Sequence, residues 1–303
     1  MAVTAAMIKE LRTITGAGMS ICKEVLVEAQ GDMDKAQEFL RQKGLAAAAK
    51  KAGRIASEGL VDIYINDDAK IGAIVEVNSE TDFVAKNNDF KSYVHDVAVQ
   101  AVNSTFSNIE SFLNGKWQNT DLTVQEELSQ KIAVIGENLN IRRVVKFETD
   151  GSIISYIHAG GKVGVMLELS CEKDEKIEEL GKNICMQIAA MNPKFVSRND
   201  VSQEFIDKER EILTQQALNE GKPANIAEKM VNGRLNKELK EFCLMDQEYV
   251  KDNELTIHQY IENVSKETGK NISIKRFVRF ATGEGLEKKE ENFAEEVSKV
   301  MKN

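Results

Sequence analysis

The chain contains 303 residues, of which 42% are hydrophobic and 29% are charged. This length suits roughly two or three domains of about 100–200 residues, and the composition is that of an ordered globular protein. The net charge of −9 argues against nonspecific binding to nucleic acid or to an anionic membrane. Only two prolines occur, and long stretches rich in Ala, Glu and Lys predict a high helix content.

The cysteines and the chain start bear on the cellular compartment. The four cysteines are scattered, without a Cys-x-x-Cys pair, at Cys22, Cys171, Cys185 and Cys243. This spacing argues against a zinc site or a disulfide scaffold and favours a reducing compartment. No run of about 18 apolar residues is present, and the first residues resemble neither a signal peptide nor a transit peptide. We therefore expect a cytoplasmic protein.

The first 44 residues predict three short helices with small apolar faces. Each face is followed by a glycine, which tolerates the left-handed conformation common after a helix, at Gly16, Gly31 and Gly44. The expected N-caps are Thr4, Ser20 and Asp32. We expect a compact three-helix bundle, followed by a helical linker at the basic, Ala-rich residues 45–54.

From residue 58 onward, the hydrophobic period changes to that of strands. Residues 60–65 and 71–77 are β-branched runs separated by the turn signal Asn66-Asp67-Asp68, which together predict a β-hairpin. The following elements are expected to be a helix at residues 89–102, an irregular polar segment at 104–120 and a helix at 124–139.

A similar unit follows. Residues 151–157 and 163–169 predict strands around a Gly-rich turn, and residues 174–190 predict a helix. Because strand, turn, strand, acidic loop and helix occur twice, we predict an α+β fold with a core of two repeated subdomains and antiparallel sheets.

The last third of the chain predicts mostly helix. Charged helices at residues 201–219 and 225–242 are joined by Glu220-Gly221-Lys222-Pro223, whose glycine ends one helix and whose proline begins the next. This pattern predicts a protruding antiparallel helical hairpin. A strand at residues 272–280 and a polar helix at residues 287–301 are expected to follow.

No pattern indicates catalysis or nucleotide binding. The chain lacks a GxxxxGK[ST] motif and a GxGxxG after a strand. Its Gly-rich residues 158–164 lie between two predicted strands, which favours a hairpin turn over a phosphate-binding helix start. The three histidines, the lack of a local His/Cys/Asp/Glu cluster and the lack of GxSxG argue against a metal or a nucleophile. We expect no enzyme, no cofactor and no metal.

The polar loop at residues 78–87 leaves two interpretations open. In the first, favoured by spacing alone, Thr81 or Asp82 caps a short helix and Phe83 is part of the core. In the second, Asp82 and Phe83 protrude together, and the aromatic ring anchors an interface. The sequence alone does not decide between them.

Several motifs together resemble the elongation factor Ts family. The polar loop carries Thr81-Asp82-Phe83-Val84, which matches the family's TDFV signature, and residues 158–164 match its HxGGxxG turn. The matches run in order over nearly the whole chain, and they include Leu11-Arg12, Thr15-Gly16-Ala17-Gly18-Met19, Cys22-Lys23, Gly136-Glu137-Asn138-Leu139-Asn140-Ile141-Arg142-Arg143, Gly221-Lys222-Pro223, Phe277-Val278-Arg279-Phe280 and Gly283-Glu284-Gly285. No single motif is decisive, but the set is specific.

The resemblance implies a modular architecture. It divides the chain into a three-helix N-terminal domain similar to ubiquitin-associated (UBA-like) domains, with its helical linker (1–55), a first core subdomain (56–148), a second core subdomain (149–195 and 240–282), a coiled-coil helical hairpin (196–239) and a C-terminal helical module (283–303).

The resemblance also implies a role in translation elongation, as a guanine-nucleotide exchange factor. The implied partner is elongation factor Tu, GDP-bound or nucleotide-free, with no direct contact to nucleic acid or membrane. The residues implied to disturb the partner's Mg²⁺ site are Thr81, Asp82, Phe83 and Val84. The other implied contacts are Met19, Lys23, His158, Tyr249 and Val250. The family allows a one-to-one complex or a two-to-two assembly built through the hairpin.

One departure and two rival functions accompany this interpretation. The family usually has proline before the aromatic residue where this chain has Glu248, which weakens the assignment of Tyr249 and Val250. A binding adaptor would account for the N-terminal helices and the hairpin, but not for the repeated core or the TDFV loop. An enzyme that holds a phosphate at residues 160–164 would bind nucleotide directly.

Overall fold

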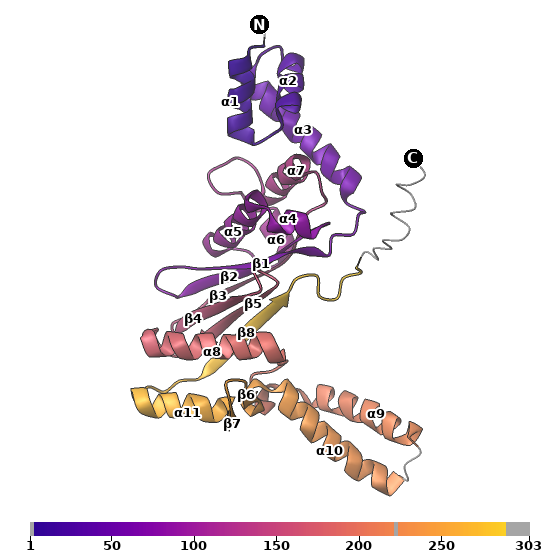
Figure 1. Ribbon diagram of the computed structural model, residues 1–303, viewed down its shortest axis with the longest axis vertical. Helices are drawn as coiled ribbons and strands as arrows, with labels where there is room; N and C mark the ends of the chain where they lie inside the picture. The colour runs from indigo at the N-terminus through magenta and orange to yellow at the C-terminus, as the bar shows by residue number, and fades with distance from the viewer. Residues whose placement is uncertain (1–2, 221–223, 289–303) are drawn as a thin grey trace. The chain divides into compact units, whose positions relative to one another are not determined.

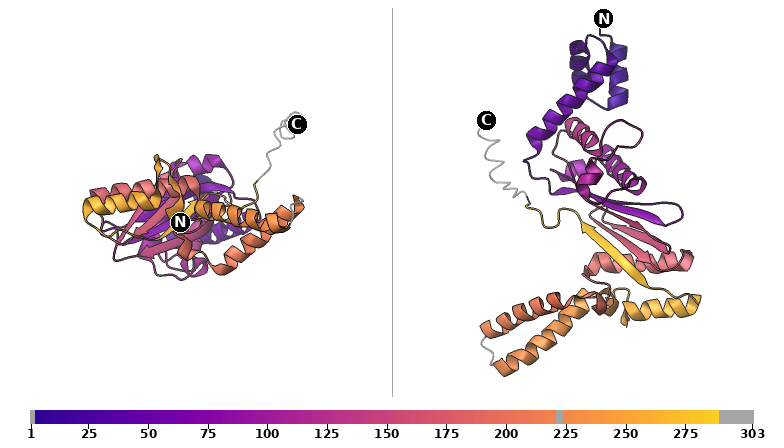
Figure 2. Two further views of the ribbon diagram at one scale, coloured as in Figure 1. Left: turned by 90° about the horizontal axis from the view of Figure 1, so that it is seen from below. Right: turned by 180° about the vertical axis from the view of Figure 1, so that it is seen from behind.

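The computed structural model describes residues 3–220 and 224–288 (Figures 1 and 2). It combines helices, including a group at the N-terminus, with small antiparallel sheets, which confirms the predicted α+β class. The chain folds into two compact units. The first contains the described residues up to Asp62, Val75–Val145 and those from Ala281 onward, and the second contains Ile63–Ile74 and Lys146–Phe280.

The N-terminal helices are α1 (Ala5–Thr15), α2 (Met19–Glu28) and α3 (Met33–Lys51), as predicted. Their shared core consists of small and aliphatic side chains, namely Leu11, Ala17, Cys22, Val25, Leu26, Ala29 and Ala36. The predicted caps at α1 and α3 are confirmed, because side-chain oxygens there accept backbone amides, at Thr4 and Asp32. Ser20 is not a cap, since α2 begins at Met19 after Gly18 without a side-chain hydrogen bond.

The third helix does not end at Gly44, contrary to the prediction. α3 continues beyond it, so most of the predicted linker is the end of the same helix. Gly44 is buried, and a Cβ at this position would lie 3.5 Å from the backbone oxygen of Ser129 in α7 (Val124–Ile135). Gly44 therefore permits close helix packing. Gly16 and Gly31 do adopt the left-handed backbone, with φ of 68° and 84°.

The first sheet has the strand order β1-β2-β3, formed by β1 (Glu58–Ile65), β2 (Ile71–Ser79) and β3 (Asn140–Glu148). The predicted turn between β1 and β2 is confirmed. The backbone amide of Asn66 donates to the carbonyl of Ile71, and the side-chain oxygen of Asn66 accepts the amide of Ile71. The prediction missed β3. Two consecutive arginines interrupt its apolar pattern, and their charge is compensated only in the folded structure.

Between β2 and β3 the chain forms α4 (Asp82–Lys86), α5 (Asn88–Asn103), α6 (Ile109–Leu113) and α7. α5 agrees with the prediction. α7 stops short of the predicted residue 139, because Gly136 ends it with a left-handed backbone at φ 88°. The segment at 104–120 is not irregular throughout, since it contains α6 and the buried Phe112 and Trp117. Its polar composition concealed these isolated aromatic residues.

The second sheet has the order β4-β5-β8, formed by β4 (Ser152–His158), β5 (Val163–Leu169) and β8 (Ile274–Ala281). β4 and β5 pair antiparallel along their whole length. α8 (Glu175–Met191) packs on this sheet (Figure 1), and the Asp174 side chain caps its first turn. These elements agree with the predicted ones within two residues at each end.

The two sheets repeat one pattern. In each, the second strand of the hairpin carries a buried glutamate at the same position, Glu76 in β2 and Glu168 in β5. Nε of Arg143 in β3 lies 2.5 Å from Oε2 of Glu76, and Nε of Arg276 in β8 lies 2.5 Å from Oε2 of Glu168. The predicted internal repeat is therefore confirmed, and it extends to the third strand of each sheet.

Helices α9 (Gln203–Asn219) and α10 (Ala224–Phe242) run side by side as the predicted hairpin (Figures 1 and 2). Their shared seam is apolar and consists of Leu213, Ala217, Val231, Leu235 and Leu239. The predicted connection at 221–223 and most of the predicted helix at 287–301 lie outside the described residues. The prediction missed short or charged elements, namely β6 (Glu248–Tyr249), β7 (Asp252–Thr256) and α11 (Ile257–Thr268).

Candidate partner-binding site

Helix α4 begins directly after Thr81, which caps it. The backbone of Thr81 is extended (φ −128°, ψ 155°), and its Oγ1 accepts a hydrogen bond of 3.3 Å from the amide of Val84. This bond satisfies an amide that the first helical turn leaves without an intrahelical partner. The capping part of the first interpretation of this loop is therefore confirmed, with Thr81 rather than Asp82 as the cap.

Phe83 does not belong to the core, contrary to the other part of that interpretation. It is 81% exposed, whereas Ala85 on the same helix is only 3% exposed. The Phe83 ring therefore contributes little to the stability of the fold. Aromatic rings of this kind often become anchors when a partner buries them, so the geometry favours the interface interpretation of the loop.

Lys86 connects two of the predicted site residues. Its Nζ donates to Oδ2 of Asp82 at 2.6 Å and lies 6.0 Å from the centre of the Phe83 ring. Sequence reasoning missed Lys86, although its i,i+4 spacing from Asp82 was a usable signal. Exposed pairs of this type contribute about 0.5 kcal/mol or less to stability. The pair therefore orients the Asp82 carboxylate more than it stabilises the fold.

Two glutamates connect this loop to the segment that follows α7. The Glu137 carboxylate accepts hydrogen bonds from Oγ1 and N of Thr81, at 2.6 and 3.1 Å. In a second contact the loop supplies the acceptor, because Oε1 of Glu80 accepts the amide of Asn138 at 2.6 Å. Nδ2 of Asn138 also donates to the carbonyl of Arg54 at 2.8 Å. The end of β2, the start of α4 and the segment after α7 thus form one hydrogen-bonded network.

His158 lies at the tip of the β4–β5 hairpin and is exposed. The next residues, Ala159 and Gly160, have positive φ, and the amide of Lys162 donates to the carbonyl of His158. The Gly-rich segment is therefore a hairpin turn, as predicted, and does not open a helix. Nδ1 of His158 lies 2.9 Å from the hydroxyl oxygen of Tyr156, a residue that sequence reasoning missed.

The remaining predicted contacts differ in exposure. Met19 and Lys23 are both exposed and lie one turn apart on α2. Val250 is 49% exposed, but Tyr249 is only 6% exposed, and its ring stacks on that of Tyr260 with 4.5 Å between centroids. Burial raises the pKa of the Tyr249 hydroxyl. Tyr249 is thus a core residue, and Val250 is the member of this pair that a partner can reach.

The predicted site residues fall in both units. Thr81, Asp82, Phe83 and Val84 lie together on one helix start in the first unit, which also contains the N-terminal helices. His158 and Val250 belong to the second unit.

Within residues 3–220 and 224–288, no group of three or more His, Cys, Asp or Glu side chains is arranged to hold a metal ion. In the same described part of the chain, no helix is both long and apolar enough to cross a membrane. Burial raises the pKa of the Cys22 and Cys185 thiols, so these side chains are poor nucleophiles.

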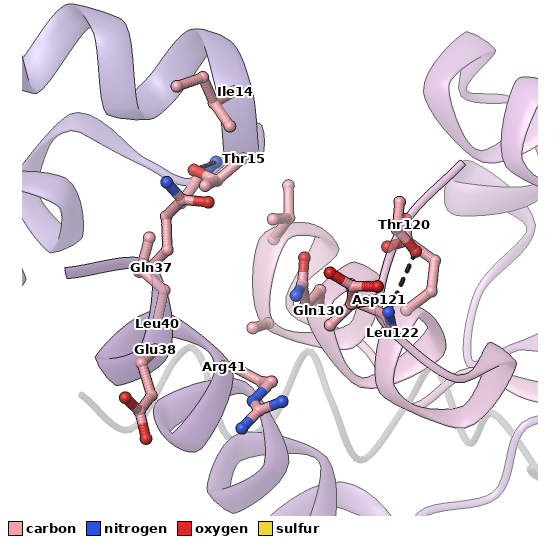
Figure 3. Close-up of a pocket in the computed structure, with 14 residues that line it drawn as sticks. Ile14, Thr15, Gln37, Glu38, Leu40, Arg41, Thr120, Asp121, Leu122 and Gln130 are labelled. Carbon is pink, nitrogen blue, oxygen red and sulfur yellow. Dashed lines mark hydrogen bonds between the residues drawn. The ribbon is translucent and has the colours of Figure 1, made fainter. Parts of the chain in front are cut away.

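A cleft of about 600 Å³ lies in the first unit (Figure 3). Residues of α1 and α3, among them Ile14 and Leu40, face α7 and the loop that precedes it. In that loop, Oγ1 of Thr120 accepts the amide of Leu122 at 3.2 Å. None of the predicted site residues lines this cleft.

Comparisons with known proteins agree with the motifs. The family model described as Elongation factor TS matches residues 80–284. A protein of Clostridioides difficile (strain 630) named elongation factor Ts is 55% identical, over 99% of this chain and 99% of the relative. Relatives of the same name from Clostridium perfringens (strain SM101 / Type A) and Clostridium acetobutylicum are 54% and 52% identical, and each comparison covers 98–99% of both chains. By sequence, motifs and architecture, the chain belongs to the elongation factor Ts family of translation elongation factors.

Proposed function

We propose that this protein is a guanine-nucleotide exchange factor that binds elongation factor Tu in its GDP-bound and nucleotide-free forms. It releases GDP so that GTP can rebind during translation elongation, and it carries out no covalent chemistry of its own. The observation that carries the proposal is Phe83, an aromatic ring that is 81% exposed on a capped and anchored helix in a chain of this family.

The proposed mechanism acts on the Mg²⁺ ion of the partner. Mg²⁺ demands near-octahedral oxygen ligands, so small displacements of these ligands weaken its binding and thereby the binding of GDP. Phe83 inserts between partner helices, and Asp82 disturbs the polar groups that orient the water ligands of the ion. His158, at the tip of the other hairpin, presses on the partner near its phosphate loop.

Other parts of the chain hold the partner in place. Met19 and Lys23 present an apolar and a charged group on consecutive turns of α2, and they contact the GTPase domain from another side. Val250 supplies a further apolar contact.

The proposal includes the five modules inferred from the resemblance and a cytoplasmic location with the translation machinery. It also includes either a one-to-one complex or a two-to-two assembly through the hairpin.

Thermodynamics constrains this mechanism. If the protein weakens GDP binding to its partner, GDP must weaken binding of the protein by the same factor. The protein therefore accelerates exchange without selecting GTP over GDP. The cellular excess of GTP sets the direction.

Stopped-flow release of a fluorescent GDP analogue from elongation factor Tu of a clostridial relative tests the proposal. We expect this protein to accelerate release strongly and to reach a plateau as its concentration rises. A GTPase of another family, loaded with the same analogue, serves as the control and should show no acceleration. A folded sample that leaves GDP release from elongation factor Tu unchanged would refute the proposal.

A further inference from the structure

We propose that Glu137 is a positioning residue that holds α4 and thereby orients Phe83 for nucleotide exchange. The rate effect rests on the exchange function proposed above, whereas the positioning itself does not. Glu137 belongs to the Gly136-Glu137-Asn138 motif, which the resemblance identified without assigning it a role.

Helix α4 depends on external contacts, because it is only five residues long. Isolated helices shorter than about 12–15 residues are marginal in water. Within α4, Ala85 is the buried side chain, at 3% exposure. The orientation of Phe83 must therefore come largely from the N-cap residue Thr81 and from the groups that hold Thr81.

Glu137 controls how Thr81 uses its hydroxyl group. A threonine hydroxyl has one proton and two lone pairs. The Thr81 hydroxyl donates its proton in a short hydrogen bond of 2.6 Å to Oε1 of Glu137. A lone pair of the same oxygen is therefore free to accept a hydrogen bond from the amide of Val84. Without an acceptor at position 137, the hydroxyl proton can turn to other acceptors and the cap loses its fixed direction.

The second oxygen of Glu137 fixes the backbone at the same residue. Oε2 accepts the amide of Thr81 at 3.1 Å, so one carboxylate holds both the side chain and the main chain of Thr81. The residues next to this pair form a second hydrogen bond in which the two segments exchange roles. Here Oε1 of Glu80, next to Thr81, accepts the amide of Asn138, next to Glu137, at 2.6 Å. These two sets of hydrogen bonds restrict movement of residues 80 and 81, and Phe83 lies only two residues after Thr81.

The structure also contains a matched pair of the same chemistry at the start of a different helix. At the start of α7, Oε2 of Glu126 accepts the amide and the hydroxyl of Thr123 at 2.9 and 3.3 Å. Glu126 and Glu137 thus each hold a threonine that caps a helix, but Glu126 holds the cap of α7. Glu126→Ala therefore controls for the general effect of losing a Glu–Thr contact.

The kinetic test compares full-length Glu137→Ala, Glu137→Gln and Glu126→Ala in the GDP-release experiment. We expect Glu137→Ala to lower the plateau rate by about tenfold or more, since Phe83 would no longer be held in one orientation and small misplacements of a positioned group have effects of this size. The concentration at half-saturation should change less than the plateau rate. Glu137→Gln keeps an acceptor and should recover much of the rate, and Glu126→Ala should keep the wild-type plateau.

A second measurement needs no partner. Amide hydrogen exchange of the free protein should become about tenfold faster at residues 81–86 in Glu137→Ala, as the loss of one or two hydrogen bonds implies. Glu126→Ala should not change exchange at those residues.

The two measurements separate the possible failures. Unchanged hydrogen exchange at residues 81–86 in Glu137→Ala would overturn the positioning role, whatever the activity of the wild type. Equal loss of plateau rate in Glu137→Ala and Glu126→Ala would also overturn it. A wild-type protein that does not accelerate GDP release would refute the proposed function instead, and hydrogen exchange would then decide the positioning role alone.

Discussion

The fully buried carboxylate of Glu76 accepts a hydrogen bond of 2.5 Å from Nε of Arg143. It also accepts the Nη1 proton of Arg142 at 3.2 Å and the amide of Gly283 at 2.8 Å. One acid thus joins β2, β3 and the segment after β8. Its counterpart in the repeat, Glu168, has a similar arginine partner, but that arginine is half exposed.

Glu76→Ala should therefore lower the free energy of unfolding by about 3–5 kcal/mol, because it removes the buried carboxylate that pairs with two largely buried arginine side chains. Urea unfolding followed by circular dichroism measures this loss. Glu168→Ala should cost less, since Arg276 and Lys275 are 50% and 45% exposed and water can solvate them. Equal losses in the two variants would contradict this explanation.

Phe83→Ala and Asp82→Ala should slow GDP release markedly while changing the free energy of unfolding by no more than about 0.5 kcal/mol, as is usual for exposed positions. The physical reason is that Phe83 is 81% exposed and has little to lose from the fold. Ile212→Ala, at another exposed apolar residue (43%), is the control and should leave release unchanged. If Phe83→Ala unfolds the protein, the ring is a core residue after all.

His158→Ala should reduce the rate of GDP release by less than Phe83→Ala does, because His158, on a hairpin tip, is proposed to act at a different part of the partner from Phe83. Tyr156→Phe removes the hydroxyl group that lies 2.9 Å from Nδ1 of His158, so it should reproduce part of the His158→Ala effect. Stopped-flow titrations of both variants check this order. An unchanged rate in His158→Ala would remove this residue from the site.

Stability should depend on pH through Glu168. Burial raises the pKa of Glu168, but the hydrogen bonds from Thr149 and Arg276, together with the positive charges of Arg276 and Lys275, outweigh burial and hold that pKa below its usual value of 4.5. Because the folded pKa is lower than the unfolded one, the stabilisation is present above about pH 4.5 and is lost as the pH falls through the folded pKa. The stability difference between wild type and Glu168→Gln, measured by urea unfolding at several pH values, should shrink below that point. A difference that does not vary with pH would rule out this contribution.

Alanine substitutions at two helical glycines should change the free energy of unfolding in opposite directions. A Cβ at Gly181 in α8 would lie 2.2 Å from Cδ1 and 3.0 Å from Cβ of Ile154. We expect Gly181→Ala to destabilise by about 1–3 kcal/mol through overpacking, which exceeds the gain in helix propensity. At Gly233 in α10, a Cβ would meet no atom within 4 Å, so Gly233→Ala should stabilise by about 0.5–1 kcal/mol. If urea unfolding shows that both variants are stabilised or both are destabilised, overpacking at Gly181 is not the explanation.

Local sequence patterns determined much of the fold. The Asn66 turn signal, the Asp32 cap and the glycine at position 16 each placed the end of an element correctly. Such signals work because capping and turn formation involve residues that are close in sequence. The same is true of the internal repeat, whose two hairpins share one hydrophobic pattern. The motifs alone also indicated the family, which the comparisons with known proteins confirm.

Only the tertiary structure decided which residues face the core. Spacing favoured a buried Phe83, which the structure shows to be exposed, and the resemblance implied a partner contact at Tyr249, whose side chain the structure shows to be buried. Gly44 resembled a helix end, and β3 was concealed by arginines whose partner, Glu76, lies on another strand. The physical reason is the same in each case. A local pattern reports which residues share one face of an element, whereas burial depends on which distant element comes to lie against that face.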